Sequence, residues 1–152
     1  MFSFLYDAKT TILGSSKYPN IRGTFWFRKT KNGVLVTAKV FELPTSNQIC
    51  KNRIFGVHIH QNGACTGNQL DPFANVGTHY NPNNCSHPQH AGDLEPLFEN
   101  NGYAYYQFLT NRFTIKEILN RSVIIHDMPD DFTTQPSGNS GNKIACGVIK
   151  KI

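Results

Sequence analysis

The strongest constraint on the fold is a pair of strand-like segments that meet at a turn. Residues 21–30 and 31–43, "IRGTFWFRKT" and "KNGVLVTAKVFEL", are rich in β-branched and aromatic residues and meet around Asn32-Gly33. An Asn-Gly pair between two such segments is a strong hairpin signal, because both residue types tolerate the backbone of a tight turn. The two segments therefore predict an antiparallel hairpin.

Further strand-like segments follow along the chain, at residues 53–60, 103–110, 122–126 and 143–152. Residues 113–119, "FTIKEIL", have helical propensity, but their neighbours favour a strand or a short turn. Seven or eight short strands with almost no helix predict an all-β fold, an antiparallel barrel or sandwich. A length of 152 residues suits a single domain over residues 1–152.

Two stretches, residues 63–102 and 127–143, lack regular periodicity and are dominated by Gly, Pro, Asn and Asp. Long structureless loops in a compact domain are uncommon and usually functional. The first stretch holds three of the six histidines. We therefore expect these two loops to carry the functional site.

Three histidines lie at the ends of strand-like segments. His58 and His60 are two residues apart within a strand pattern, so both side chains lie on the same face of the sheet. Imidazoles held on a rigid strand are well placed to bind copper or zinc. His126 ends another strand, directly before the second loop. As a set, the histidines favour a metal site over separate structural roles.

The stretch "SHPQHAGDL", residues 86–94, places His87, His90 and Asp93 at three-residue steps. An isolated His-x-x-His is more often a polar surface turn than a ligand pair. The alternative is a metal site, and the other histidines favour that alternative.

The chain is basic, with 15 Lys and Arg against 10 Asp and Glu, a net charge of +5 and a pI near 9.1. This balance would help to capture an anion. The basic residues are scattered along the sequence, so we expect no nucleic-acid partner. No apolar stretch approaches the ~20 residues of a membrane span, so no membrane association is expected. The first ten residues lack signal-peptide features, which predicts a cytoplasmic location, with an extracellular one as the open alternative.

Five motifs occur in an order that resembles the copper/zinc superoxide dismutase family: "FGVHIHQNG", "GTHYNP", "HAGDL", "SVIIH" and "GNKIACGVI". The resemblance extends from about Lys9 to Ile149. It implies an eight-stranded antiparallel Greek-key β-barrel with two long functional loops. It also implies an enzyme that converts two superoxide anions to dioxygen and hydrogen peroxide by alternating reduction and oxidation of copper.

The resemblance implies one copper and one zinc ion per chain. His79 would bridge the two metals and act in catalysis. The copper ligands would be His58, His60, His79 and His126. The zinc ligands would be His79, His87, His90 and Asp93.

Further roles follow from the same resemblance. Asp130 would hydrogen-bond a copper histidine and a zinc histidine, with a simple turn cap as the alternative. Cys65 and Cys146 would form an intrasubunit disulfide, which composition alone would not predict for a cytosolic protein. Cys50 and Cys85 have no counterpart role in the resemblance and are expected to be free thiols by default, although Cys85 is close enough to His87 in sequence to be considered as an accidental metal ligand.

The chain departs from the family pattern at Lys143, which stands where relatives have an active-site arginine. Lysine keeps the positive charge but lacks the forked donor geometry of the guanidinium group. Lys143 is therefore expected to attract superoxide as a catalytic cation.

The spacing of His87 and His90 is a second departure, because relatives usually separate these two ligands by about nine residues. A β-turn brings its first and last residues within about 7 Å and favours proline at its second position. We expect "HPQH" to form such a turn, with Pro88 second, so that both histidines reach one ion.

The resemblance also implies partners: superoxide as substrate, a second copy in a homodimer, and a copper chaperone. The competing function is a non-enzymatic copper-binding or copper-sequestering protein on the same fold. Such relatives usually lack one or more copper ligands, whereas this chain has all of them.

Overall fold

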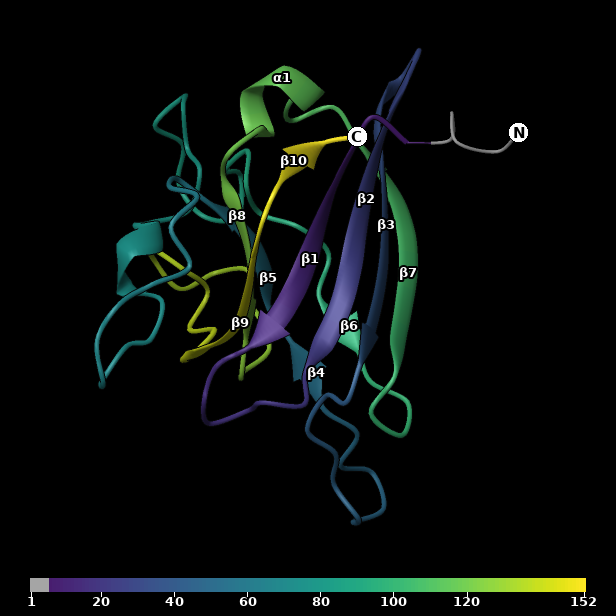
Figure 1. Ribbon diagram of the computed structural model, residues 1–152, viewed down its shortest axis with the longest axis vertical. Helices are drawn as coiled ribbons and strands as arrows, with labels where there is room; N and C mark the ends of the chain where they lie inside the picture. The colour runs from purple at the N-terminus through teal and green to yellow at the C-terminus, as the bar shows by residue number, and fades with distance from the viewer. Residues whose placement is uncertain (1–5) are drawn as a thin grey trace.

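A computed structural model describes residues 6–152 as a curled antiparallel sheet with long loops on one side (Figure 1). The main sheet has eight strands in the order β5-β8-β9-β1-β2-β3-β7, with β10 paired to β1. The expected eight-stranded antiparallel Greek-key fold is confirmed. The main strands are β1 Ala8–Gly14, β2 Arg22–Thr30, β3 Gly33–Phe41, β5 Val57–His60, β7 Ala104–Thr110, β8 Ser122–His126, β9 Lys143–Val148 and β10 Lys150–Lys151.

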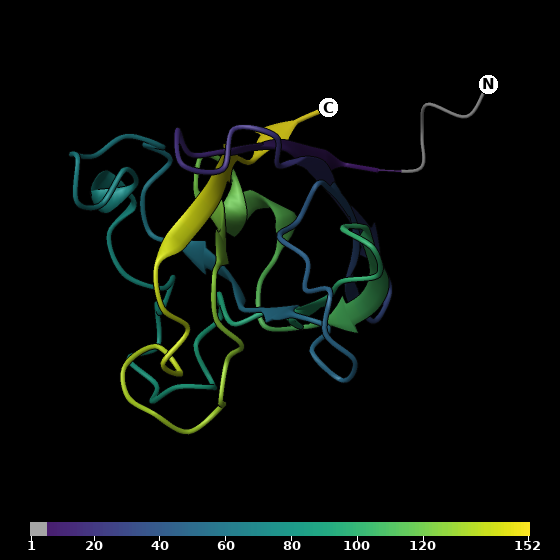
Figure 2. The ribbon, with the colours of Figure 1, turned by 90° about the horizontal axis from the view of Figure 1, so that it is seen from below.

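Two short strands form a second sheet, β4 (Ile54–Phe55) and β6 (Leu97–Phe98), and β6 lies against β7. Figure 2 shows the main sheet curving around the interior as a half-barrel. Alternate residues of each strand point inward, so Phe25, Phe27 and Val36 are fully buried in the interior. Each such side chain contributes roughly 1.5–3 kcal/mol by leaving water.

The predicted hairpin joins β2 to β3, but its turn lies one residue earlier than expected. Thr30 pairs with Gly33, so Lys31 and Asn32 form the two-residue loop. Gly33 has φ +136° and lies so close to Thr110 O that a Cβ would overlap it. The glycine is therefore needed as the first residue of β3 rather than within the loop.

The segment 113–119 contains a single short helical turn, α1 (Ile115–Ile118), so of the two expected alternatives, a strand or a short turn, the strand was wrong. A capping box starts this helix: Thr114 N donates to Glu117 Oε2 at 2.7 Å. Thr-x-x-Glu before an apolar pair is a helix-start signal in the sequence. Strand β1 was not predicted from the sequence. Its buried residues Ala8, Thr10 and Ile12 nevertheless alternate with exposed ones, which is the period of two typical of a strand.

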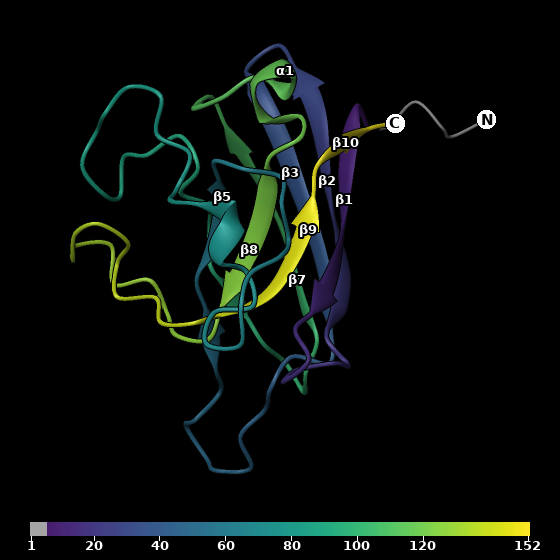
Figure 3. The same ribbon diagram turned by 60° about the vertical axis from the view of Figure 1, so that its left-hand side comes forward.

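Two loops leave the sheet on the same side, beyond β5 and β8 (Figure 3). The first connects β5 to β6 and contains only a 3₁₀ turn, η1 (Ala74–Val76). The second connects β8 to β9 without a helix or strand. These are the two irregular stretches expected from the sequence. In residues 6–152 no helix is long and apolar enough to cross a membrane.

Candidate metal centre

Strands β5 and β8 bring three histidines together at the end of the barrel that carries the loops. His58 and His60 lie two residues apart on β5, and every residue of that strand is buried. His126 ends β8, where a register shift follows Ile125. The Nε2 atoms of His60 and His126 are 3.4 Å apart.

The first loop returns alongside β5 through backbone hydrogen bonds. Tyr80 N donates to Ile59 O, Ile59 N to Gly92 O, and Gly92 N to Tyr80 O, each at 2.8 Å. These bonds fix the two residues beside them, His79 and Asp93, against the strand. Isolated β-bridges pair His79 with His60 and Asp93 with His58.

Two groups of four side chains result, and within each group the ligand atoms lie within 4.8 Å of one another. His79 belongs to both groups. The first group, the four-histidine group, consists of His58, His60, His79 and His126; the second, the Asp93 group, consists of His79, His87, His90 and Asp93. The structure thus brings together every histidine that the sequence singled out.

In the four-histidine group, the hydrogen bonds of each ring indicate which nitrogen atom is available to bind a metal. His60 Nδ1 is 2.8 Å from Gly77 O and His126 Nδ1 is 3.5 Å from Gly141 O, which leaves Nε2 of both rings for the group. His58 Nδ1 and His79 Nε2 are buried without a hydrogen-bond partner. Buried polar atoms normally have partners, so two orphaned nitrogens directed at one group fit a metal ion.

The other nitrogen of His79 faces the Asp93 group. His79 Nδ1 is 2.8 Å from Asp93 Oδ1 and 3.3 Å from His90 Nδ1. The same carboxylate approaches the remaining ligand atoms, with Asp93 Oδ2 3.1 Å from His87 Nδ1 and 3.3 Å from His90 Nδ1. Three nitrogens and one oxygen are a donor set typical of zinc.

The short spacing of His87 and His90 works through two consecutive turns. Gln89 N donates to Ser86 O at 2.8 Å, and Asp93 N donates to His90 O at 3.2 Å. The first turn therefore runs from Ser86 to Gln89, with a cis His87–Pro88 peptide and the proline in third position. The expected frame, with Pro88 second, was wrong by one residue.

Asp130 joins the two groups from outside. Its Oδ2 is 2.7 Å from His58 Nε2 and its Oδ1 is 2.8 Å from His87 Nε2. Gly138 packs against this contact with φ +67°, and a Cβ there would overlap Asp130 Oδ1 and lie 2.6 Å from His87 Nε2. Asp130 is therefore more than a turn cap, although it also accepts a bond from Phe132 N.

Burial and neighbouring side chains shift the pKa values of several residues in the two groups. Burial lowers the pKa of His60 to about 3, with the neighbouring His79 acting in the same direction. Burial and adjacent histidines also hold the pKa values of His58 and His126 well below the ordinary range. For Asp93, burial favours the neutral acid, but hydrogen bonding to His79 and the nearby histidines outweigh it and lower the pKa. Neutral imidazoles and an ionised carboxylate are the forms that bind metals.

A pocket of about 360 Å³ connects the four-histidine group to the surface, and its lining includes His60, His79, His126 and Lys143. Lys143 is the first residue of β9, and its Nζ donates to Asp71 Oδ2 of the first loop. The expected cation is therefore at the pocket, but it is paired with a carboxylate.

The expected disulfide between Cys65 and Cys146 is confirmed, with a Cα–Cα distance of 5.8 Å. It ties the first loop to β9. Cys50 and Cys85 are exposed free thiols. Cys85 is not part of the Asp93 group, although His87 is.

Sequence reasoning missed several residues around the site. Asp71 pairs with Lys143, and Gln135 bonds the backbone of His87. Neither residue gives a local signal, because its partner is distant in the sequence. Gly138 lies in the glycine-containing stretch "PSGNSG", which could have suggested positive φ angles.

The family model described as "Copper/zinc superoxide dismutase (SODC)" matches residues 21–149. A superoxide dismutase [Cu-Zn] of Photobacterium leiognathi is 32% identical over 84% of this chain and 78% of its own length. One of Legionella pneumophila is 30% identical over 95% of this chain and 87% of its own length. Among solved structures, a double mutant of a SOD-like protein from Bacillus subtilis superposes with a TM-score of 0.74. It is 26% identical, with 92% of this chain and 95% of that chain covered.

Proposed function

Because the chain belongs to the copper/zinc superoxide dismutase family, we propose that it is a superoxide dismutase, which converts two superoxide anions and two protons to dioxygen and hydrogen peroxide. One observation carries the proposal: two buried groups of four ligand side chains share His79. A single imidazole between two sites is the arrangement that a bridged copper and zinc pair requires.

The four-histidine group would hold copper and the Asp93 group would hold zinc. In the described part of the chain, five buried side-chain polar atoms lack a hydrogen-bond partner, and three of them are His58 Nδ1, His79 Nε2 and His87 Nδ1. His87 Nδ1 is 3.1 Å from Asp93 Oδ2, but the contact does not have the geometry of a hydrogen bond. All three face the two groups, which supports metal binding there. When bound, copper supplies one-electron chemistry by alternating between two oxidation states, whereas zinc has no redox chemistry and is structural.

The chain's own residues supply binding, orientation and a proton. Lys143 and the basic chain attract the anion to the pocket beside His60 and His126. His79 Nε2 is buried and has no hydrogen-bond partner, so whenever it is free of metal it can take up a proton and give it to the departing peroxide. Asp130 fixes the ring orientations of His58 and His87, a role that typically matters 10–100-fold for affinity or activity.

Metal analysis and a superoxide assay on the same preparation test the proposal. We expect the parent protein to bind one copper and one zinc ion per chain and to dismutate superoxide. The His79→Ala variant should have lost this activity. Cys85→Ala, which alters an exposed thiol outside both groups, is the matched control and should leave both readouts unchanged. Bound copper and an intact fold without dismutation would contradict the proposed enzymatic activity. It would favour the alternative, a non-enzymatic copper-binding protein, and one structural relative is itself described as SOD-like.

The proposal includes two protein partners, a second copy of the chain and a copper chaperone. Both rest on the family alone. Light scattering of the metal-loaded protein should give twice the chain mass if the homodimer forms. A filter-binding assay at physiological salt should show no retention of nucleic acid.

A further inference from the structure

In the Asp93 group, His87 and His90 are only three residues apart, so the turn between them must be held in a defined shape for both rings to reach one ion. We propose that Arg112 and Gln135 are positioning residues that hold the His87–His90 turn from two sides and thereby set the affinity for zinc. The inference rests on the proposed zinc site. It concerns two residues that touch no ligand atom and come from different parts of the chain.

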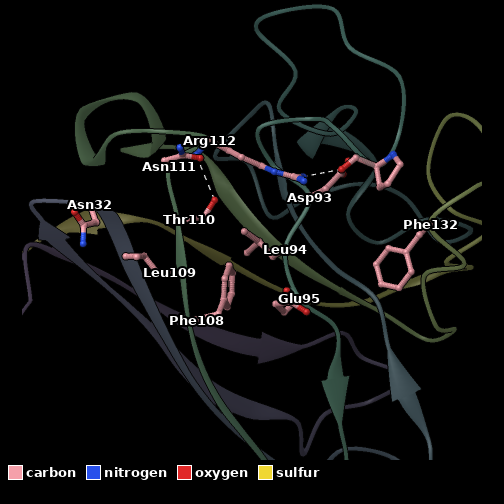
Figure 4. A pocket seen from close by; sticks show the side chains of 11 residues that line it. Asn32, Asp93, Leu94, Glu95, Phe108, Leu109, Thr110, Asn111, Arg112 and Phe132 are labelled. Atoms are coloured by element: carbon pink, nitrogen blue, oxygen red, sulfur yellow. Dashed lines mark hydrogen bonds between the residues drawn. The ribbon is translucent and has the colours of Figure 1, made fainter.

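Arg112 lies after β7 and reaches the turn from the barrel side. Its Nη1 donates to Pro88 O at 2.6 Å and to His90 O at 3.4 Å. Figure 4 shows the Arg112 side chain extended across a pocket of about 470 Å³, toward the segment that carries Asp93. A guanidinium group offers several donors in one plane, so a single side chain can bind two carbonyls of a turn.

Gln135 lies in the second loop and bonds the same turn at a different residue, His87. His87 N donates to Gln135 Oε1 at 2.8 Å, and Gln135 Nε2 donates to His87 O at 2.7 Å. The side-chain amide thus pairs with both backbone groups of one residue. This pairing fixes the backbone from which the His87 ring projects.

Together the two residues restrain three positions of the turn through its backbone: His87 at both groups, Pro88 at its carbonyl and His90 at its carbonyl. The rings of His87 and His90 are then directed at Asp93 without a long loop around them. A turn ordered in advance does not lose further conformational freedom when the ion binds, so the affinity is higher. Removing either restraint should weaken zinc binding without altering any ligand atom.

Competition of the metal-free full chain with a chromophoric chelator for zinc measures this effect. We expect Arg112→Ala and Gln135→Ala each to weaken zinc binding by about 10–100-fold, the range usual for groups that orient metal ligands. Arg112→Lys keeps the charge and a single donor nitrogen but loses the planar fork, so it should recover part of the loss. Gln135→Glu keeps the acceptor for His87 N and removes the donor, so it should be intermediate.

Two variants serve as matched controls. Arg22→Ala removes an exposed arginine from β2, and Gln107→Ala removes an amide that bonds Thr37 on the face of β7. Neither residue approaches the Asp93 group, so zinc affinity should equal that of the parent. Copper binding by the four-histidine group, followed by its visible absorption, reports whether each variant keeps its fold.

The outcomes separate this inference from the proposed function. If the parent binds zinc and Arg112→Ala and Gln135→Ala bind it equally well, the positioning role is overturned and the zinc site remains. If the parent binds no zinc, the proposed zinc site fails and the inference fails with it. Weaker zinc binding with unchanged copper binding supports the inference, whereas equal loss of both metals overturns it, because it would indicate general unfolding.

Discussion

Lys143 and Asp71 form an ion pair at the pocket that leads to the four-histidine group. Both charges act on His60, where Lys143 lowers the pKa and Asp71 raises it. The carboxylate therefore cancels part of the field that a lone cation would produce. A sequence-based view of Lys143 as a free steering charge is incomplete, because its partner lies 72 residues away.

Asp71→Asn should raise the rate of dismutation at low salt and steepen its decline with salt. Removing the carboxylate leaves the ammonium group uncompensated, and cationic steering can raise on-rates by roughly 10 to 10³-fold. Lys143→Glu should cut the rate at least several-fold, and Lys143→Arg should equal or exceed the parent. Rates measured between 0.01 and 0.1 M salt check this, since the Debye length falls from ~30 Å to ~10 Å over that range.

Copper content measured on every variant is the control for these rates. Unchanged copper with an unchanged rate and salt profile in both Asp71→Asn and Lys143→Glu would show that neither charge guides the anion. The steering role would then belong to other basic residues.

Gly138→Ala should weaken the binding of both metals. An added Cβ would overlap Asp130 Oδ1 and displace the carboxylate from His58 and His87. Losing the group that orients two ligands should cost about 10–100-fold in metal affinity. Zinc and copper titrations of the metal-free protein measure the effect.

Gly102→Ala is the matched control, because this glycine also has a positive φ, +81°, and lies between β6 and β7. Both variants carry a backbone penalty of roughly 1–2 kcal/mol for an alanine in the left-handed region. Equal metal affinities for the two variants would mean that backbone strain, rather than the contact with Asp130, is what matters.

At the scale of elements, local sequence patterns predict most strands but not the exact turns and segments that connect them. The alternation in residues 21–43 predicts β2 and β3, because inward and outward side chains differ in polarity. The turn between them lies at Lys31 and Asn32, since Gly33 is needed where Thr110 approaches. In the segment 113–119, the capping box of Thr114 outweighs the preference of the neighbouring strands.

The candidate site is likewise predictable from the sequence only in part. The proposed ligand residues have recognisable types and spacings, so the family motifs indicate them. The contacts that hold them depend on tertiary structure: Arg112 approaches from the end of β7, and Gln135 from a loop 48 residues after His87. No periodicity connects such pairs, so only the folded chain brings them together.

The disulfide is an element-scale restraint whose removal has a calculable effect. Cys65 and Cys146 are 81 residues apart, and in the chain-entropy model closing such a loop stabilises by about 4–5 kcal/mol. Replacing both with serine should lower the free energy of unfolding of the metal-free protein by up to that amount, as measured in urea. Non-reducing peptide maps of the parent should link the same two cysteines.

The free thiols provide the control for that experiment. Cys50→Ser and Cys85→Ser change exposed thiols that form no disulfide, so the free energy of unfolding should be unaffected. A peptide map that linked Cys50 to Cys85 would contradict the placement of the first loop.

At the scale of the whole molecule, burying a cluster of histidines makes the metal-free protein sensitive to acid. The folded pKa of His60, about 3, is far below the ordinary value of about 6.5 for the unfolded chain, and those of His58 and His126 are lowered as well. Below pH 6.5 the unfolded chain therefore binds protons that the folded chain does not. Stability must fall as the pH is lowered through this range.

We expect the free energy of unfolding of the metal-free protein to decline steadily from pH 7 toward pH 4, with the buried histidines as the cause. Each histidine that stays neutral contributes a slope of up to about 1.4 kcal/mol per pH unit. Asp93, whose pKa is lowered, adds a further loss only nearer pH 4, where the unfolded carboxylate takes up its proton. His60→Gln removes one of the titrating groups, so its slope should be shallower than that of the parent. Urea unfolding at a series of pH values checks both profiles. A parent midpoint that stayed flat from pH 7 to pH 5 would contradict the prediction, because it would mean that the histidines take up protons in the folded chain as readily as in the unfolded chain.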